Sequence, residues 1–238
     1  MRKIGFSTGA LAHSDFRQGI EVLRRKGIVV IEISALRQQE LEPLVLSLDG
    51  LDLSGFDYVS IHAPSRIKDC SEPRILALLQ DVVKRKFPII VHPDVIKDSD
   101  AWRSLGSLLV VENMDKRKPC GRTAEELDRV FDQLPEATFC LDLGHAHQVD
   151  KTMSEASLIL RRFGERLRQL HLSEVSTAHK HNPLSMESVF AFRRVSNEIA
   201  DDVPVVLESR VNLEEVEDEI AFARRALPSQ NATVAASD

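Results

Sequence analysis

The sequence has few cysteines and no long apolar run, and both absences exclude classes of protein. Only three cysteines occur among the 238 residues, at Cys70, Cys120 and Cys140, and no two form a C-x-x-C pair. Neither a disulfide framework nor a thiolate zinc site is therefore expected. No apolar run approaches the roughly 18–20 residues that a membrane-spanning helix needs. The first residues also lack the apolar segment and cleavage site of a signal peptide, so we expect a cytoplasmic protein.

The chain also lacks an excess of positive charge and an internal linker. Its formal net charge is −6 at pH 7, which gives no general attraction for nucleic acids or other polyanions. No Gly/Ser-rich or low-complexity segment occurs before Pro228, and the residues after it are small and polar. We expect one domain over residues 1–228 and a disordered tail at 229–238.

What the sequence does contain is an alternation of short apolar runs and amphipathic segments. Six segments carry Leu, Val, Ile or Phe at helical spacing, namely Asp15–Lys26, Glu72–Lys86, Thr123–Gln133, Ser154–Phe163, Ser188–Ile199 and Leu213–Ala226. The connection at Asp98–Gly106 is short, and only a stunted helix is expected there. The eight strand-like runs are Lys3–Ser7, Val29–Ser34, Tyr58–His62, Pro88–His92, Leu108–Glu112, Thr138–Asp142, Leu167–Leu172 and Val203–Glu208.

This alternation predicts a parallel sheet covered by helices. An open, doubly wound sheet and a closed barrel both satisfy it. Eight units in a chain of 238 residues, close to the roughly 250 typical of a (β/α)8 barrel, favour the closed form. The expected fold class is α/β, as a single (β/α)8 TIM barrel.

Residues that can bind a metal ion stand at or beside the ends of most of these strands. In a parallel barrel, the C-terminal strand ends converge on one face, where active sites lie. Each residue alone could equally be a hydrogen-bonded core residue or a salt-bridge partner. Together, many carboxylates and imidazoles buried at one mouth are costly unless they are paired or bind metal, which favours a metal cluster. The residues are His62, His92, Glu112, Asp142, His145, His171, His179, His181 and Glu208.

The motifs around these residues resemble those of the xylose isomerase-like TIM barrel superfamily. That superfamily includes AP endonuclease family 2 and the sugar-phosphate isomerases and epimerases. The similarity extends from Ser60 to Glu208. It is carried by His-Ala-Pro, Val-His-Pro, Val-Glu-Asn, Leu-Asp-Leu-Gly-His-Ala-His, His-Leu-Ser-Glu, His-x-Pro-Leu and Leu-Glu.

The resemblance to AP endonuclease family 2 implies three metal subsites. The first would be His62 and His92 with Glu112 as a bridge. The second would be completed by Asp142, His171 and Glu208, and the third would be His145, His179 and His181. The chain departs from the family pattern at His179, where the family has Asp, at Ser185–Glu187, where it has a glycine pair, and at Glu174, which replaces Asp.

Two reactions fit this pattern. The resemblance to the isomerases implies one Mn²⁺-like ion, held by Glu112, Asp142, His171 and Glu208. The two glutamates would then move a proton on the sugar substrate. Three ions with three carboxylates instead leave a formal charge of 6 − 3 = +3, which attracts an anion and suits phosphoester hydrolysis. The additional histidines favour the hydrolase, with Glu112 and Glu208 as catalytic residues. Isomerisation or epimerisation of a sugar or sugar phosphate is the alternative.

The expected cofactors are two to three divalent ions per chain. Imidazole-rich ligation favours Zn²⁺, and the carboxylates leave Mn²⁺ or Fe²⁺ open.

The cations near the mouth indicate a small anionic or sugar-like substrate, with Arg66, Lys180 and Arg210 as phosphate contacts. The long basic loops and intercalating side chains expected for abasic DNA are not evident, so nucleic acid is the less favoured substrate. The run Lys116–Lys118 is interpreted as a solvated loop, with a polyanion contact as the alternative. No role is assigned to His13, Glu32, Trp102 or His147.

Overall fold

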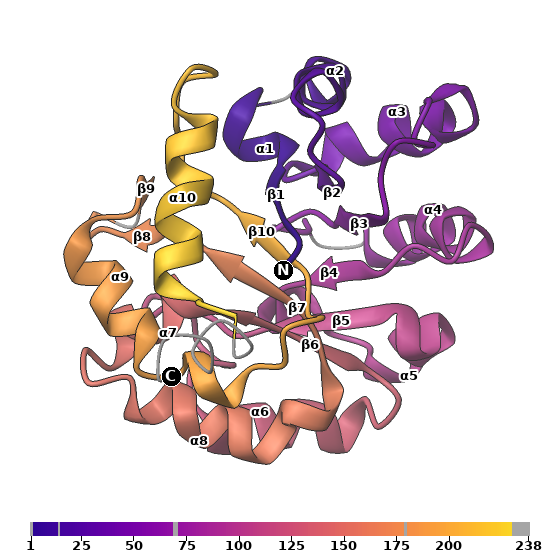
Figure 1. Ribbon diagram of the computed structural model, residues 1–238. Helices are drawn as coiled ribbons and strands as arrows, with labels where there is room; N and C mark the ends of the chain where they lie inside the picture. The colour runs from indigo at the N-terminus through magenta and orange to yellow at the C-terminus, as the bar shows by residue number, and fades with distance from the viewer. Residues whose placement is uncertain (1, 14, 69–70, 179, 230–238) are drawn as a thin grey trace.

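The computed structural model describes residues 2–13, 15–68, 71–178 and 180–229. The predicted strands form a closed parallel barrel surrounded by helices (Figure 1). Parallel pairing of Ile4 with Val205 joins the first barrel strand to the last and closes the ring. The TIM barrel prediction is therefore confirmed. The eight strands are β1 (Ile4–Ser7), β2 (Val30–Ser34), β3 (Tyr58–His62), β4 (Ile89–Val91), β5 (Leu109–Glu112), β6 (Thr138–Asp142), β7 (Leu167–Leu172) and β10 (Val205–Leu207).

Each of the six predicted amphipathic segments overlaps a helix of the outer ring, but the helix predicted to reach Ile199 ends at Arg193. Side-chain caps start several of these helices; Asp15, for example, accepts the backbone N–H of Gln18, and Thr123 accepts that of Glu126. Among the described residues, no helix is long and apolar enough to cross a membrane. The helices are α1 (Thr8–Leu11), α2 (Phe16–Arg25), α3 (Gln38–Ser47), α4 (Glu72–Lys84), α5 (Ser99–Trp102), α6 (Ala124–Gln133), α7 (Leu143–Val149), α8 (Ser154–Phe163), α9 (Met186–Arg193) and α10 (Val216–Ala226).

Helices α1, α3 and α7 and strands β8 and β9 were not predicted from the sequence. Helix α3 contains Pro43 in its interior, a residue that normally ends a helix. Helix α7 begins directly after β6 and is only seven residues long, so it shows little periodicity. The strands β8 (Glu174–Val175) and β9 (His181–Asn182) form a small antiparallel hairpin beyond the end of β7. The predicted short connection after β4 does hold only the four-residue helix α5.

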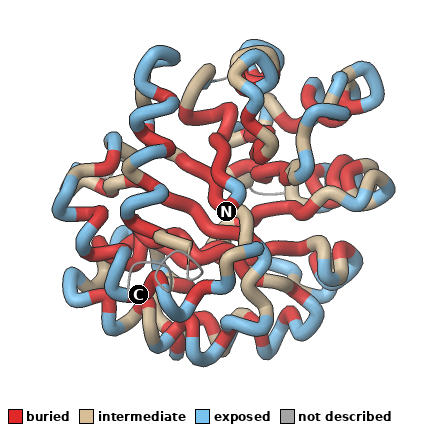
Figure 2. The backbone as a smooth tube through the Cα atoms, in the orientation of Figure 1, coloured by how far each residue is buried: buried red, intermediate tan, exposed pale blue. Residues whose placement is uncertain are grey.

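The barrel strands are buried along most of their length, as the red segments of Figure 2 show. Successive residues of a strand point to opposite faces of the sheet. Ile90, Val110 and Cys140 form a small buried cluster of their own, separate from the main core between strands and helices. His92 and Glu112 each follow one of these residues by two positions, and so does Asp142. This alternation places them on the same face, one step nearer the C-terminal end of the barrel.

Candidate metal centre

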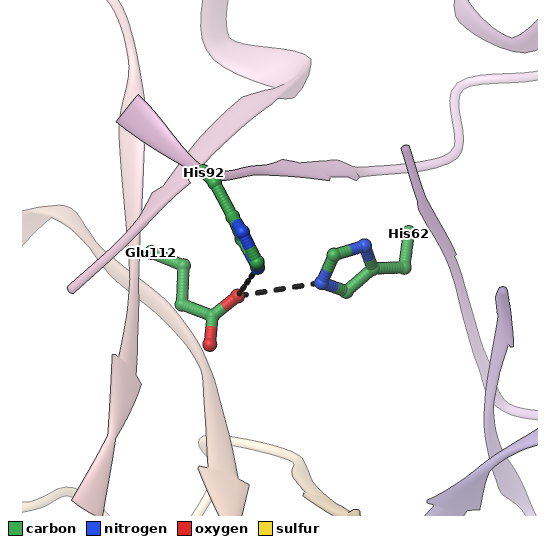
Figure 3. Close-up of side chains that lie close together, drawn as sticks. All are labelled: His62, His92 and Glu112. Atoms are coloured by element: carbon green, nitrogen blue, oxygen red, sulfur yellow. Dashed lines mark ion pairs between the residues drawn. The ribbon is translucent and has the colours of Figure 1, made fainter. Parts of the chain in front are cut away.

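The Glu112 carboxylate lies at the middle of the histidine cluster and is 1% exposed. Its Oε2 atom is 3.4 Å from Nε2 of His62 and 3.3 Å from Nε2 of His92 (Figure 3). Its Oε1 atom is 3.3 Å from Nδ1 of His171 on the other side. The ligand atoms of His62, His92 and Glu112 all lie within 4.8 Å of one another. The carboxylate therefore stands between two groups of candidate ligands.

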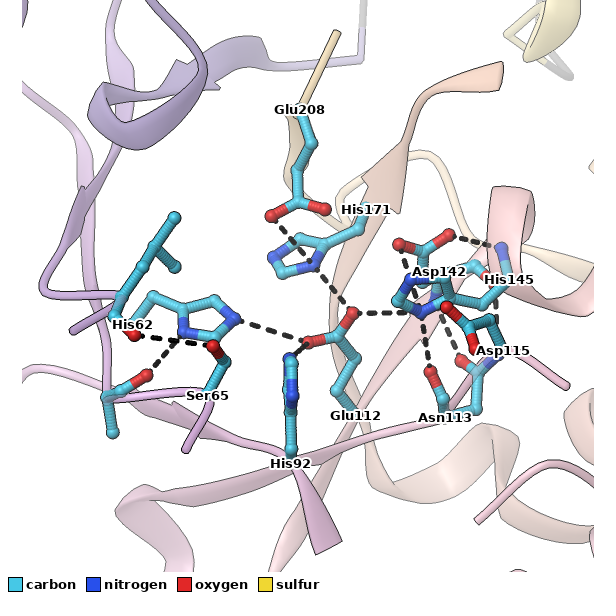
Figure 4. A network of polar contacts seen from close by, with 12 residues as sticks. His62, Ser65, His92, Glu112, Asn113, Asp115, Asp142, His145, His171 and Glu208 are labelled. Carbon is cyan, nitrogen blue, oxygen red and sulfur yellow. Dashed lines mark hydrogen bonds and ion pairs between the residues drawn. The ribbon is translucent and has the colours of Figure 1, made fainter. Parts of the chain in front are cut away.

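Asp142, His171 and Glu208 form the second group around Glu112, and their ligand atoms also lie within 4.8 Å of one another. Asp142 caps α7, because its Oδ1 accepts the backbone N–H of His145 at 2.7 Å. The side chain of Asn113 ties the ends of β5 and β6 together: it donates to the carbonyl of Asp142 at 2.9 Å and accepts from its N–H at 2.7 Å. These bonds leave Oδ2 of Asp142 facing the centre (Figure 4).

Two of the three residues predicted for a third subsite lie together. The rings of His145 and His181 are 5.6 Å apart between centroids. Nδ1 of His145 is 3.0 Å from the carbonyl oxygen of Asn113; since a carbonyl only accepts, Nδ1 carries the proton and Nε2 is left as the ligand atom. Nδ1 of His181 is 3.3 Å from Oε2 of Glu208. His179 lies outside the described residues.

Several buried polar atoms of this centre have no hydrogen-bond partner among the described residues. They include Oε2 of Glu112, Oδ2 of Asp142 and Nδ1 of His171. Buried polar atoms are normally satisfied, because leaving them unpaired costs free energy. The unsatisfied atoms are imidazole nitrogens and carboxylate oxygens, the donors that Zn²⁺, Mn²⁺ and Fe²⁺ accept. The residues therefore fit a group of divalent ions.

The carboxylates also hold protons on the imidazoles when no cation is bound. Burial by itself lowers the pKa of His62, but Glu112 and Glu32 together raise it to about 9. Burial likewise opposes the charge on His145, and Asp142 and Glu112 raise its pKa to about 10. Metal binding requires deprotonated imidazole. A bound cation would replace these protons and supply the positive charge that they now provide.

Glu32 of β2 belongs to this centre, although its sequence context did not indicate a role. Its side chain is fully buried, and its Oε2 lies 3.0 Å from Nε2 of His171. The same oxygen accepts hydrogen bonds from Gln169 at 2.7 Å and from Ser60 at 3.3 Å. An apolar strand interrupted by one acidic residue was the only sequence signal, and the same pattern also fits a salt bridge.

A cavity of about 430 Å³ opens above the metal centre. Its lining includes His62, His92, Glu112, His145, His181 and Glu208, together with the cations Arg66, Arg117 and Lys118. Of the three predicted phosphate contacts, only Arg66 lines this cavity. Lys180 and Arg210 are exposed residues outside its lining.

Arg117 and Lys118 belong to the run interpreted as a solvated loop, but both are held by carboxylates beside the cavity. Nη2 of Arg117 is 2.5 Å from Oδ2 of Asp115, whose side chain is 2% exposed. Nζ of Lys118 is 2.6 Å from Oδ2 of Asp94. These anchors direct part of the loop charge toward the cavity.

Comparisons with known proteins agree with this fold. Endonuclease IV from Thermus thermophilus is 20% identical, with a TM-score of 0.59, and the match covers 94% of this chain and 98% of that one. A xylose isomerase domain-containing protein from Salmonella typhimurium is 13% identical, with a TM-score of 0.67 and coverages of 95% and 97%. The protein SacUVDE is 15% identical, with a TM-score of 0.57 and coverages of 94% and 99%.

Sequence comparison gives the family directly. No curated protein matches this chain. The model of the xylose isomerase-like TIM barrel family matches residues 94–226, which is more than half of the chain and includes seven of the nine predicted ligands. The resemblance in the strand-end motifs is therefore confirmed, and the chain belongs to the xylose isomerase-like TIM barrel family.

Proposed function

We propose that this protein is a metal-dependent hydrolase that cleaves a phosphoester in a small anionic substrate. The observation that carries the proposal is the position of Glu112 between two ligand groups, with one carboxylate oxygen toward His62 and His92 and the other toward His171. A carboxylate shared in this way suits a centre with more than one ion, as in two-metal phosphoester hydrolysis. A one-metal isomerase has no need of His62 and His92.

The charge of the centre also favours several ions. When all four are ionised, Glu32, Glu112, Asp142 and Glu208 contribute four negative charges in the space of a few side chains. With one divalent ion, the formal net charge of the centre would be 2 − 4 = −2, which repels a phosphoester. Three ions would leave 6 − 4 = +2, which attracts one. Two ions would give a neutral centre, still more favourable to an anion than one ion.

The residues would divide the work as follows. One ion would be held by His62, His92 and Glu112. A second would be held by Asp142, His171 and Glu208, again with Glu112. A third would be held by His145, His181 and His179. Zn²⁺ suits this donor set best, with Mn²⁺ or Fe²⁺ as alternatives. Such ions acidify water and stabilise charge on phosphoryl oxygens. Glu208, which lines the cavity and is 13% exposed, would accept a proton there.

The cavity supports a small substrate. Its volume of about 430 Å³ falls in the range of small-molecule sites, roughly 300–1,000 Å³. Arg66, Arg117 and Lys118 line the same space as the ligand groups. Arg117 and Lys118 are paired with Asp115 and Asp94, which also line the cavity, so an anionic group beside the reacting phosphoester would meet Arg66 first. We propose these three cations as substrate contacts. Lys180 and Arg210 would reach only a substrate that extends beyond the cavity.

The alternative is a metal-dependent isomerase or epimerase acting on a sugar or sugar phosphate. One observation favours it: Glu112, Asp142, His171 and Glu208 already form a complete four-ligand set. The two glutamates would then move a proton on the substrate. This reaction needs one ion, and it leaves His62 and His92 without a function.

A substrate panel separates the two reactions. Metal-loaded protein is expected to release nitrophenol from p-nitrophenyl phosphate or its diester, or phosphate from sugar phosphates. Protein stripped by a chelator should be inactive and should recover when Zn²⁺ or Mn²⁺ is returned. An abasic duplex, run in parallel, should be a poor substrate. Deuterium uptake from D₂O into sugar C–H positions, without phosphoester cleavage, would instead establish the isomerase.

A further inference from the structure

We propose that Glu32 is a positioning residue for the metal centre: it holds His171 so that Nδ1, and not Nε2, faces the ion. The inference rests on the metal centre of the proposed function. It does not depend on the reaction catalysed, because metal binding can be measured without a substrate.

Glu32 is buried in the interior of the barrel. It lies in β2, paired in register with Ser60 of β3, and no part of its side chain is exposed. It is not among the residues that line the cavity. A direct contact with substrate is therefore excluded by its depth, and its effect must pass through a neighbour.

The carboxylate of Glu32 contacts the imidazole of His171. Nε2 of His171 lies 3.0 Å from Oε2 of Glu32 and 2.7 Å from the side-chain nitrogen of Gln169. A carboxylate only accepts, and a hydrogen bond to a charged acceptor is stronger than one from a neutral amide, so we assign the proton of Nε2 to the bond with Glu32. This leaves Nδ1 as the lone-pair nitrogen, 3.3 Å from Oε1 of Glu112 and 3.8 Å from Oε1 of Glu208. A carboxylate behind a ligating imidazole fixes its tautomer and orientation and makes it a better ligand.

Other side chains of the barrel interior hold Glu32 in place. Gln169 donates to Oε2 of Glu32 at 2.7 Å, and its own oxygen accepts the hydroxyl of Tyr58 at 2.9 Å. Tyr58, Gln169 and Glu32 come from β3, β7 and β2, so the carboxylate is fixed from across the barrel interior. A side chain held at this depth loses little further entropy when His171 binds a cation.

A competing role for Glu32 is that of a ligand. Its carboxylate, an imidazole nitrogen of His62 and an oxygen of Glu208 lie within 4.8 Å of one another. However, Nδ1 of His62 donates to the carbonyl of Ala63 at 2.7 Å, which leaves only Nε2 as a ligand atom. That nitrogen faces Glu112. The geometry therefore favours the positioning role.

The experiment measures metal binding in Glu32→Leu and Glu32→Gln. Titration of metal-free protein with Zn²⁺ against a competing chelator should show a 10- to 100-fold weaker affinity for one bound ion in Glu32→Leu, the range roughly typical for partners behind a metal ligand. Glu32→Gln should lose less, since its amide oxygen still accepts from His171. The number of ions bound at saturation should be unchanged. Ser34→Ala, in the same buried strand, is the control and should bind as the wild type does.

A spectroscopic readout distinguishes positioning from a general loss of structure. In protein with ¹⁵N-labelled histidine, the Zn²⁺-loaded wild type should show a protected Nε2–H signal for His171 that disappears in Glu32→Leu and persists in Glu32→Gln. Loss of one whole equivalent at saturation in both variants would overturn the proposal and make Glu32 a ligand. Unchanged affinity in Glu32→Leu would overturn it as well. If the protein shows no hydrolysis yet Glu32→Leu weakens metal binding, the proposed reaction fails and this inference stands.

Discussion

Glu112→Gln should reduce phosphoester hydrolysis by about 1,000-fold, which corresponds to about 4 kcal/mol of transition-state stabilisation. The neutral amide has the shape of the carboxylate but cannot bridge two cations. Loss of the carboxylate charge also leaves the imidazoles of His62, His92 and His171 without the negative group that they share in the wild type. The bound metal should fall by at least one equivalent per chain, measured by elemental analysis after dialysis.

The matched control for this variant is Glu125→Gln. Glu125 is 80% exposed and pairs with Arg129 on the surface of α6, so its charge is lost without any effect on the centre. This variant should keep wild-type activity and metal content. A Glu112→Gln protein that retained all its ions and more than a tenth of its activity would show that Glu112 is not the bridge.

The double variant His62→Ala/His92→Ala should lose one metal equivalent and at least about 100-fold in hydrolysis. Both imidazoles face the same oxygen of Glu112, and alanine offers no ligand atom in their place. The set of Glu112, Asp142, His171 and Glu208 is left intact. The measurement is kcat/KM on the best substrate of the panel, together with metal content.

This double variant separates the two candidate reactions. A one-metal isomerase should keep most of its rate, because its four ligands are untouched. His13→Ala, which removes an exposed histidine of the first loop, is the control for the loss of an imidazole. Full hydrolytic activity in the double variant would show that the subsite of His62 and His92 is not needed for hydrolysis.

The ligands could be predicted from sequence because strand geometry places them. A residue such as His92 or Glu112 ends a short apolar run, and the C-terminal ends of parallel strands meet whatever the paths of the loops. Alternation within the strand then decides which side chains face the barrel interior. The prediction therefore needed only the strand boundaries, and the C-terminal boundaries agree with the structure to within about one residue.

The role of Glu32 could not be predicted, because its partners lie far away in sequence. His171 is separated from it by 139 residues, and the contact runs across the barrel interior between strands that are not neighbours. No pattern along β2 or β7 indicates which interior residues will meet. The structure was needed to distinguish a buried positioning residue from a salt-bridge partner.

The positions of the cations at the mouth could not be predicted for a different reason. They stand in loops, whose paths are decided by local contacts and not by strand periodicity. Arg117 and Lys118 lie beside the cavity because Asp115 and Asp94 hold them. Lys180 directly precedes β9 of the small hairpin, whose two-residue strands are too short to show a periodicity in the sequence.

The most direct test of the account is the metal content of the wild-type protein. Protein purified without chelator and saturated with Zn²⁺ should contain two to three equivalents per chain, and anomalous diffraction should place one ion on each side of Glu112. A single saturable equivalent, bound by Glu112, Asp142, His171 and Glu208 with His62 and His92 empty, would contradict the multinuclear hydrolase and support the isomerase.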